Sequence, residues 1–381
     1  MTGEMTILSN ARIVTADAVI EGSVVAADGI IQAVKPGPSL HAGAIDLEGD
    51  YLLPGLVELH TDNLENHFSP RPGVRWPGLA AVIGHDAQVA AAGITTVLDA
   101  IAVGESAKPG NRLEYLHAMV DAIGEARRKD VLRAEHRLHL RCEISHAETL
   151  PLFQSLLERE HVDMISIMDH TPGQRQFATV EKYRDYYMKK YGFSAEQFSA
   201  FYERQMEAHH RYSAPNRSAI VALAKARGLA IASHDDATAA HVEEAIADGM
   251  AIAEFPTTIA AAELSHASGM QVLMGAPNVI RGGSHSGNVS ALDLAERGLL
   301  DILSSDYVPG SLLQSAFRLA EEKQITLPQS VAKVSRNPAA AVGLTDRGEI
   351  APGKRADLVR VRDVEGLAVV RTVWREGQRV I

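Results

Sequence analysis

The sequence predicts an α/β protein: a TIM-type (β/α)₈ barrel with a small composite β-sandwich domain formed by both termini. Eight apolar, strand-like runs alternate with helix-like segments through the middle of the chain. Such alternation favours a parallel sheet, and eight units favour its closure into a barrel of roughly 250 residues. Short apolar runs broken by turn residues occupy the two ends of the chain and indicate a separate small sheet.

The strand-like runs of the predicted barrel are short and rich in aliphatic residues. They cover residues 52–59, 94–100, 138–144, 162–168, 229–232, 250–255, 271–274 and 300–303. Helix-like segments include residues 113–128, 218–227, 241–249 and 311–323. The stretch 178–215 is long, aromatic and charged, which predicts a helical insertion over the barrel mouth.

The two ends of the chain are expected to pair into one sheet domain. Residues 7–14, 18–25 and 30–34 read as strands near the start, and residues 357–362 and 368–374 read as strands near the end. Because a lone hairpin is barely stable, the ends should complete each other. The predicted domains are therefore the N-terminal part of the sandwich (1–52), the barrel (53–345) and the C-terminal part of the sandwich (346–381).

The composition limits the classes of partner. The 381-residue chain is 46% hydrophobic and carries a formal net charge of −11, so bulk attraction to nucleic acid or an anionic membrane is not expected. No segment reads as a signal peptide or a membrane span. The single cysteine, Cys142, cannot form an intramolecular disulfide, which fits a cytoplasmic protein. Assembly into a homo-oligomer is left open.

Metal-ligand residue types stand where several barrel strands should end. His60 and Asp62 follow the first run, and side chains two residues apart in an extended segment share one side. Functional groups of such barrels sit at the carboxyl ends of the strands. Four further run ends provide Glu143, His170, His234 and Asp306. Nitrogen and oxygen ligands suit divalent metals, and six ligands suggest two ions that share a bridging water, with zinc favoured over manganese or iron.

Simpler interpretations apply to each residue taken singly. One histidine at a strand end is more often a hydrogen-bonding residue than a ligand, and the convergence of five strand ends is what favours a metal site. Glu143 has an alternative role as a partner of a ligand, or of Arg141 or Arg175. Cys142 reads as a buried, inert thiol. The remaining histidines of this part of the chain are interpreted as structural or surface residues: His67, His85, His136, His139, His146, His209, His210 and His266.

Three segments resemble the amidohydrolase superfamily. They are Leu-Pro-Gly-Leu-Val-Glu-Leu-His at 53–60, Ala-Gly-Ile-Thr-Thr-Val at 92–97, and Gly-Glu-Ile-Ala-Pro-Gly-Lys-Arg-Ala-Asp-Leu-Val at 348–359. The resemblance implies a sandwich built from both termini and a first-strand metal pair at His60 and Asp62. It also implies that Asp306 is the eighth-strand aspartate that takes a proton from the attacking water.

The chain departs from the superfamily pattern at several of these positions. Asp62 stands where a second histidine is usual, and no lysine ends a strand, so Glu143 is the substitute for the usual bridging ligand. His170 and His234 fall one strand earlier than the usual fifth and sixth strands. The ligand layout is therefore expected to differ in part from that of the superfamily.

A closer resemblance rests on His-Thr-Asp-Asn-Leu-Glu-Asn-His at 60–67, Pro-Arg-Pro-Gly-Val-Arg-Trp-Pro at 70–77, and Gly-Ala-Pro-Asn-Val-Ile-Arg-Gly-Gly-Ser-His-Ser-Gly at 275–287. These segments are similar to amidohydrolases of the carbon–phosphorus lyase pathway. That family hydrolyses α-D-ribose 1-methylphosphonate 5-triphosphate to the 5-phosphate and pyrophosphate in phosphonate catabolism. The resemblance implies a phosphorylated ribose as the small-molecule substrate.

The residues agree with an anionic substrate, because a triphosphate needs cations and oriented N–H donors. Arginine binds phosphate in bidentate fashion, and glycine lets the backbone approach closely. The candidate phosphate-binding residues are Arg71, Arg75, Arg175, Asn278, Arg281, Gly282, Gly283, Ser284 and His285. The alternative, a flexible glycine turn with solvated arginines, is less favoured.

Two other functions remain open from the sequence. One is a deaminase or amidohydrolase that acts on a cyclic amide or a nucleobase-like ring, although the arginine-rich and glycine-rich segments favour an anion. The other is a non-catalytic scaffold that kept the barrel, although such proteins usually lose metal ligands and this set looks complete.

Overall fold

The computed structural model describes residues 5–104, 111–159, 161–175, 183–184, 188–189, 192–284, 287–322 and 325–381. The chain divides into two compact units. The first contains Met1–Asp99, Ala122–Arg137 and Gly275–Ile381, and the second contains Ala100–Asp121 and Leu138–Met274. The domain boundaries expected at residues 52 and 345 stay a prediction.

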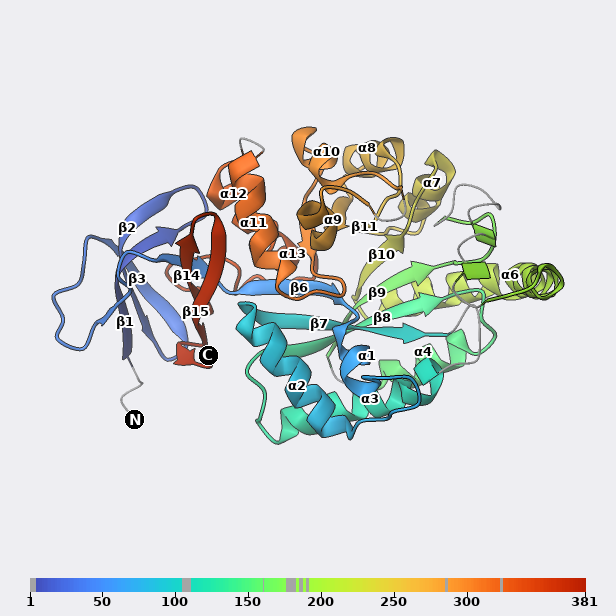
Figure 1. Cartoon of the computed structure of the whole chain (residues 1–381), viewed down its shortest axis with the longest axis horizontal. Coiled ribbons are helices and arrows are strands. Elements are labelled where there is room, and N and C mark those ends of the chain that lie inside the picture. The colour runs from blue at the N-terminus through green and yellow to red at the C-terminus, as the bar shows by residue number, and fades with distance from the viewer. Residues whose placement is uncertain are drawn as a thin grey trace. The chain divides into compact units, whose positions relative to one another are not determined.

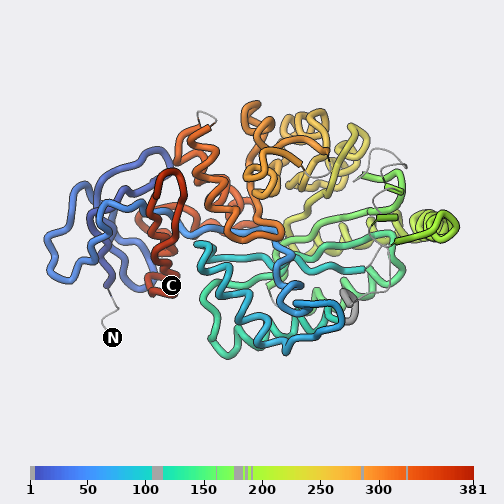
Figure 2. Tube along the Cα trace, viewed as in Figure 1, coloured from blue at the N-terminus to red at the C-terminus, as the bar shows by residue number. Residues whose placement is uncertain are grey.

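The terminal sheet lies within the first unit and joins both ends of the chain, as the sequence predicts. Its strand order is β16-β15-β14-β5-β1-β2-β3, with β4 beside β1. Strand β14 pairs antiparallel with β5, so segments about 300 residues apart lie side by side (Figures 1 and 2). The strands are β1 (Met5–Val14), β2 (Val19–Ala27), β3 (Ile30–Pro36), β4 (Ile45–Asp46), β5 (Tyr51–Pro54), β14 (Leu358–Val364), β15 (Leu367–Arg375) and β16 (Gln378–Arg379).

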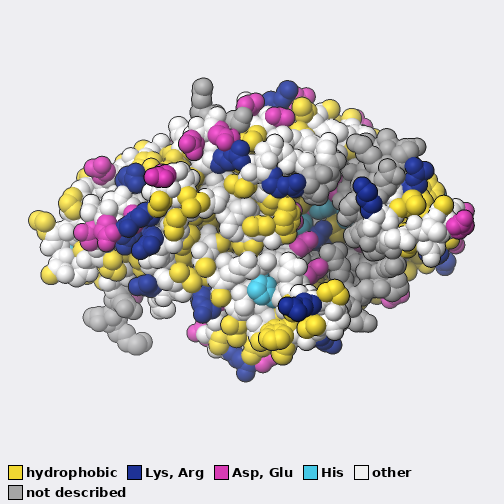
Figure 3. Space-filling view, viewed as in Figure 1, with side chains coloured by type: hydrophobic (Ala, Val, Ile, Leu, Met, Phe, Trp, Pro, Cys, Tyr) yellow, Lys and Arg dark blue, Asp and Glu magenta, His cyan; other side chains and the backbone are white. Residues whose placement is uncertain are grey.

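Alternation of side chains gives this sheet an apolar core and a charged outer surface. Leu8, Ile13 and Trp374 belong to one buried cluster that draws on both chain ends. Arg360 and Arg362, which alternate with buried residues of β14, donate hydrogen bonds to the carboxylate of Asp50. Basic and acidic side chains are intermixed over this part of the surface (Figure 3). The pattern is that of a sheet with one packed face and one solvated face.

The second sheet has eight strands in the order β13-β12-β11-β10-β9-β8-β7-β6. A parallel bridge between Thr61 and Asp306 joins the ends of the first and last strands. The strands are β6 (Leu56–Thr61), β7 (Ile94–Val103), β8 (Glu135–Glu143), β9 (Val162–Met168), β10 (Ala230–His234), β11 (Ile252–Glu254), β12 (Gln271–Gly275) and β13 (Ile302–Ser304). Each predicted run overlaps one of these strands, and the TIM-type barrel is confirmed.

The first predicted run is in fact two strands. Residues 51–54 form β5 of the terminal sheet, and β6 of the barrel begins at Leu56. Gly55 separates them, and its amide donates to the carbonyl of Asp357 at 2.7 Å. A Cβ at this position would lie 2.2 Å from the Thr95 hydroxyl oxygen. The chain therefore changes sheets at a residue where only glycine fits without displacement of its neighbours.

Helices follow most barrel strands. They are α1 (Asn63–Phe68), α2 (Gly78–Ala91), α3 (Asn111–Arg128), α4 (Thr149–Leu157), α6 (Ala195–Ala226), α7 (Ala239–Ala247), α8 (Ile259–Ala267), α9 (Ala276–Arg281), α10 (Ala291–Glu296), α11 (Ser311–Glu322), α12 (Leu327–Ala332) and α13 (Arg336–Ala341). Among the described residues, no helix is long and apolar enough to span a membrane.

The long helix α6 accounts for much of the predicted insertion. A capping box of Ser194 and Gln197 starts it, which satisfies two backbone N–H groups at the helix terminus. The helix passes through Pro215 and ends at Ala226, beyond the boundary expected from the sequence. Part of the stretch 178–194 lies outside the described residues.

Candidate metal centres

The first unit brings together His60, Asp62 and Asp306. His60 is the penultimate residue of β6, Asp62 follows that strand, and Asp306 follows β13. Each offers a ligand atom within 4.8 Å of the other two, and His60 Nε2 lies 3.8 Å from Asp62 Oδ1. Because two ligand atoms bound to one ion lie about 3 to 4 Å apart, this spacing fits a divalent metal.

Backbone hydrogen bonds hold this first cluster in register. The amide of Asp62 donates to the carbonyl of Asp306 at 2.9 Å, and the amide of Asp306 donates to the carbonyl of His60 at 3.0 Å. The two strand ends are thus joined at the three candidate ligands. Asp306 has a φ of 54°, a left-handed conformation that is uncommon outside glycine and that clusters at functional sites.

Glu58 forms hydrogen bonds with the backbone of both segments that carry this cluster. Its carboxylate oxygens accept the His60 amide at 2.7 Å and the Ser305 amide at 2.6 Å. Burial raises the pKa of Glu58 to about 7, against the opposing effect of those hydrogen bonds. One buried side chain therefore fixes the backbone next to both His60 and Asp306.

The second unit brings together His170, His234 and Asp235. The Nε2 atoms of the two histidines lie 3.8 and 3.7 Å from Asp235 Oδ2. Asp235 follows β10 with a φ of 57°, and its amide donates to the carbonyl of Glu254 at 2.9 Å. The donor set is again imidazole nitrogen and carboxylate oxygen, which suits zinc, manganese or iron.

Both histidines of the second cluster are oriented by carboxylates. Glu143 Oε2 lies 2.6 Å from His170 Nδ1, and Glu254 Oε2 lies 2.7 Å from His234 Nδ1. An ionised carboxylate only accepts, so Nδ1 carries the proton and Nε2 keeps its lone pair for a ligand bond. Carboxylate–histidine pairs of this kind are typical of metal sites.

Glu143 thus stands behind a candidate ligand rather than among the ligand atoms. Besides His170 Nδ1, it accepts the His170 amide at 3.1 Å and the Ser145 hydroxyl at 2.8 Å. This placement corresponds to the alternative role considered from the sequence. The sequence-based candidates did not include Asp235 and Glu254, although the first follows His234 directly and the second is the penultimate residue of the run 250–255.

A third carboxylate–histidine pair lies next to the second cluster. Asp169 follows β9, and its Oδ2 lies 2.7 Å from Nδ1 of His209 on α6. The hydroxyl of Ser213, one turn further along α6, donates to the same oxygen at 3.1 Å. The bond from Asp169 raises the pKa of His209. The long helix is therefore tied to the end of β9 through His209, which the sequence predicts to be a structural or surface residue.

The candidate phosphate-binding residues fall into different environments. Arg71, Arg75 and Arg281 are exposed, all in the first unit. Gly282 and Gly283 follow α9 with φ values of 77° and 155°, and a Cβ on either would meet no atom within 4 Å. Ser284 adjoins them and is half-buried, and His285 lies outside the described residues.

Asn278 and Arg175 make specific bonds to other protein groups. The side-chain amide of Asn278 donates to the Val289 carbonyl at 3.2 Å, and its oxygen accepts the Ala291 amide at 3.0 Å. The buried guanidinium of Arg175 bonds Asp236 and Glu244. Asn278 therefore holds the loop that follows α9, and the charge of Arg175 is balanced within the protein.

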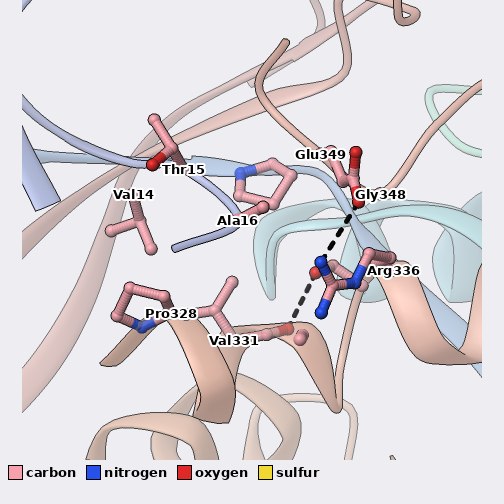
Figure 4. Close-up of a pocket in the computed structure, with 11 residues that line it drawn as sticks. Val14, Thr15, Ala16, Pro328, Val331, Arg336, Gly348 and Glu349 are labelled. Carbon is pink, nitrogen blue, oxygen red and sulfur yellow. Dashed lines mark hydrogen bonds and ion pairs between the residues drawn. The ribbon is translucent and has the colours of Figure 1, made fainter. Parts of the chain in front are cut away.

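A small pocket near the terminal sheet lies apart from these residues. Val14, Pro328 and Val331 line it, together with an ion pair of Arg336 and Glu349 at 3.3 Å (Figure 4). None of the candidate ligands or phosphate-binding residues belongs to its lining. It lies between β1 and the helices α12 and α13.

Comparison with known proteins gives a consistent family. The model of the amidohydrolase family matches residues 51–380. An α-D-ribose 1-methylphosphonate 5-triphosphate diphosphatase of Escherichia coli K12 is 54% identical over 376 residues, covering 98% of this chain and 100% of the relative. An adenine deaminase of Methylobacterium nodulans is 42% identical over 84 residues, covering 22% of this chain and 12% of the relative.

Solved structures of low sequence identity share the fold. A 5-methylcytosine deaminase from Klebsiella pneumoniae has a TM-score of 0.66 and 17% identity, covering 99% of this chain and 98% of its own. An N-acetylglucosamine-6-phosphate deacetylase from Pasteurella multocida has a TM-score of 0.62 and 15% identity, covering 99% of each chain. These likenesses support the barrel with its terminal sheet.

Proposed function

Because the chain belongs to the amidohydrolase family, we propose that it hydrolyses α-D-ribose 1-methylphosphonate 5-triphosphate to the 5-phosphate and pyrophosphate. The observation that carries this proposal is the 54% identity to the Escherichia coli diphosphatase of that name over its full length. The exposed arginines and the open glycine turn of the first unit support it, because they suit a polyanion better than a neutral ring.

The proposal includes one divalent ion at each cluster, with zinc favoured and manganese or iron as alternatives. His60, Asp62 and Asp306 would hold one ion, and His170, His234 and Asp235 the other. Such ions, when bound, lower the pKa of a bound water and neutralise phosphate oxygens. Glu143 enters this proposal as the partner that orients His170, in place of the bridging role expected from the sequence.

The chain itself would supply proton transfer and substrate binding. Asp306 would take the proton of the attacking water, since its carboxylate projects from a fixed strand end. The residues that would bind the phosphates, with Asn278 holding their loop, are Arg71, Arg75, Arg281, Gly282, Gly283, Ser284 and His285. Arg175 is left out because two carboxylates already neutralise it.

The test is phosphorus NMR of the chain with a ribose 5-triphosphate and a divalent metal. We expect the triphosphate resonances to be replaced by those of pyrophosphate and a 5-phosphate. Chelation should stop the reaction, and added zinc, manganese or iron should restore it. Release of inorganic phosphate alone, or of ammonia from a cyclic amide with the triphosphate left intact, would contradict the proposal.

A further inference from the structure

A buried chain of ionisable side chains crosses the first unit beside the His60 cluster. It contains His85 and Asp86 of α2, Asp99 of β7 and His136 of β8, and all four side chains are fully buried. His85 Nε2 lies 2.7 Å from Asp99 Oδ1, and His136 Nδ1 lies 2.8 Å from Asp99 Oδ2. His136 Nε2 lies 3.3 Å from Asp86 Oδ1.

The hydrogen bonds assign a charge to each member. Both ring nitrogens of His136 face carboxylates, and a carboxylate only accepts, so both nitrogens must be protonated. Asp86 also accepts the backbone amides of Arg133 and Ala134, each at 2.9 Å, which favours its ionised form. His136 is therefore an imidazolium between two carboxylates. Burial alone lowers the pKa of His136, but Asp99 and Asp86 together raise it to about 9.

His85 is the neutral link at the other end of the chain. Its Nε2 donates to Asp99, and its Nδ1 lies 3.0 Å from the Asn63 side-chain amide, which donates. The same Asn63 nitrogen donates to Gln88 Oε1 at 3.0 Å, which agrees with this assignment. Burial lowers the pKa of His85, as expected for a neutral ring.

This arrangement does not suit a metal ion, although His85, Asp99 and His136 are close enough to share one. The nitrogens that face Asp99 carry protons and have no lone pair to give. Their separations of 2.7 and 2.8 Å from the carboxylate are those of charge-assisted hydrogen bonds. The group is therefore a hydrogen-bonded network that includes the side chain of Asn63.

Asn63 connects the network to the proposed metal ligands. It follows Asp62 directly, begins α1, and its amide donates to the Thr61 hydroxyl at 3.3 Å. We propose that the network positions Asp62 by holding the Asn63 side chain, and so sets the affinity of the His60 cluster for its metal. This inference rests on the proposed function only in taking Asp62 as a ligand.

The physical reason is that Asp62 follows the strand end and is less enclosed than His60. Its side chain is 24% exposed, whereas that of His60 is 1% exposed. A partner held by four buried, mutually bonded groups restricts the φ and ψ angles available at residue 62. Groups that orient metal ligands in this way typically change metal affinity by 10- to 100-fold when removed.

The test compares Asn63→Ala with the wild-type chain by titrating zinc against a chromophoric chelator. We expect one of the two tight equivalents to weaken by about 10- to 100-fold, while the other keeps its affinity. The matched control is Asn337→Ala, because the Asn337 amide donates to the Asp301 carbonyl at 2.8 Å at the opposite end of a barrel strand. The control should bind both ions as the wild type does.

Nitrogen NMR of the ring atoms supplies a readout that a general loss of stability would not imitate. At pH 7.5, His136 should appear as an imidazolium and His85 as the neutral Nε2–H tautomer. In Asn63→Ala, His85 should stay neutral while its Nδ1 resonance moves, because the donor to that nitrogen is gone.

Two results overturn the inference: unchanged zinc affinity in Asn63→Ala, or a neutral His136 in the folded wild type. Failure of the proposed function is seen separately, as a wild-type chain that binds zinc but releases no pyrophosphate. In that case the zinc titration and the NMR spectra still decide whether the network positions Asp62.

Discussion

The two candidate metal-ligand clusters offer the same kinds of donor atom but are held in different ways. The His60 cluster is fixed through the backbone, by amides of Asp62 and Asp306 and by the carboxylate of Glu58. The second cluster also has backbone bonds, from the amides of His170 and Asp235, and in addition its rings are held by Glu143 on His170 and Glu254 on His234. The backbone bonds fix the positions of the strand ends, and the ring bonds determine which imidazole nitrogen can bind a metal.

This difference has a chemical consequence. A carboxylate on Nδ1 makes the opposite nitrogen a stronger donor, so the second cluster is suited to tight metal binding. The first cluster has two aspartates and one histidine, and Asp306 offers a carboxylate that can take a proton. We therefore expect changes at Asp306 to affect turnover, and changes at the second cluster to affect metal affinity.

The largest effect is expected for Asp306. Asp235, the aspartate of the second cluster, has the same left-handed backbone conformation and serves as its matched comparison. Asp306→Asn should lower kcat by about 10³-fold at saturating metal, because the amide cannot accept the proton. Asparagine tolerates the left-handed conformation, so the fold should stay intact. Asp235→Asn should recover most of its activity when metal is added in excess. Steady-state pyrophosphate release checks both variants, and equal losses that metal does not restore would remove the distinction between the clusters.

The sequence was sufficient for the barrel and for selecting most members of the two candidate clusters, because both depend on local patterns. Strand β9 has the predicted bounds, since its apolar run is bordered by polar residues. His60, Asp62, His170, His234 and Asp306 could be selected because each ends or follows a run. Because the runs form strands of one parallel sheet, residues at their carboxyl ends lie at the same edge of that sheet.

Other features could not be read from the sequence because they depend on tertiary pairing. The bond between Glu143 and the His170 ring, at 2.6 Å, is one example, because no spacing rule predicts which strand-end carboxylate contacts a ring. The charges of His85 and His136 likewise follow from partners brought together by folding. Arg175 looked like a phosphate ligand because Asp236 and Glu244, which neutralise it, are about 60 to 70 residues away.

The second-largest effect is expected at Glu254, which holds the His234 ring of the second cluster. Glu254→Gln should weaken zinc binding by about 10- to 100-fold, because the amide orients the His234 ring less firmly than a carboxylate does. Competition with a chromophoric chelator measures the change. Glu158→Gln, which removes an exposed carboxylate on the same unit, should leave the affinity unchanged. A Glu254→Gln chain that binds zinc as tightly as the wild type would show that the ring partner is not needed.

A smaller effect is expected at Arg281, where a substitution should change substrate binding without changing metal binding. Arg281→Ala should raise KM for the triphosphate by about 10-fold with little change in kcat, because charge-assisted hydrogen bonds to a phosphate are lost. Zinc affinity should stay that of the wild type. Arg128→Ala, which removes another exposed arginine of the first unit, serves as the control. A rise in KM of the same size in both variants would show that Arg281 acts only through general electrostatic attraction.

The smallest expected effect tests the bond from Asp169 to His209 beside the second cluster. That bond raises the pKa of His209 above its value in the unfolded chain. The stabilisation is therefore complete below about pH 6.5 and is lost as the pH rises through the folded-state pKa. Urea unfolding should show a free-energy difference between wild type and His209→Gln of about 1 kcal/mol at pH 5.5, decreasing by pH 9. The exposed His210→Gln control should show no such trend, and a difference independent of pH would mean that His209 acts through packing alone.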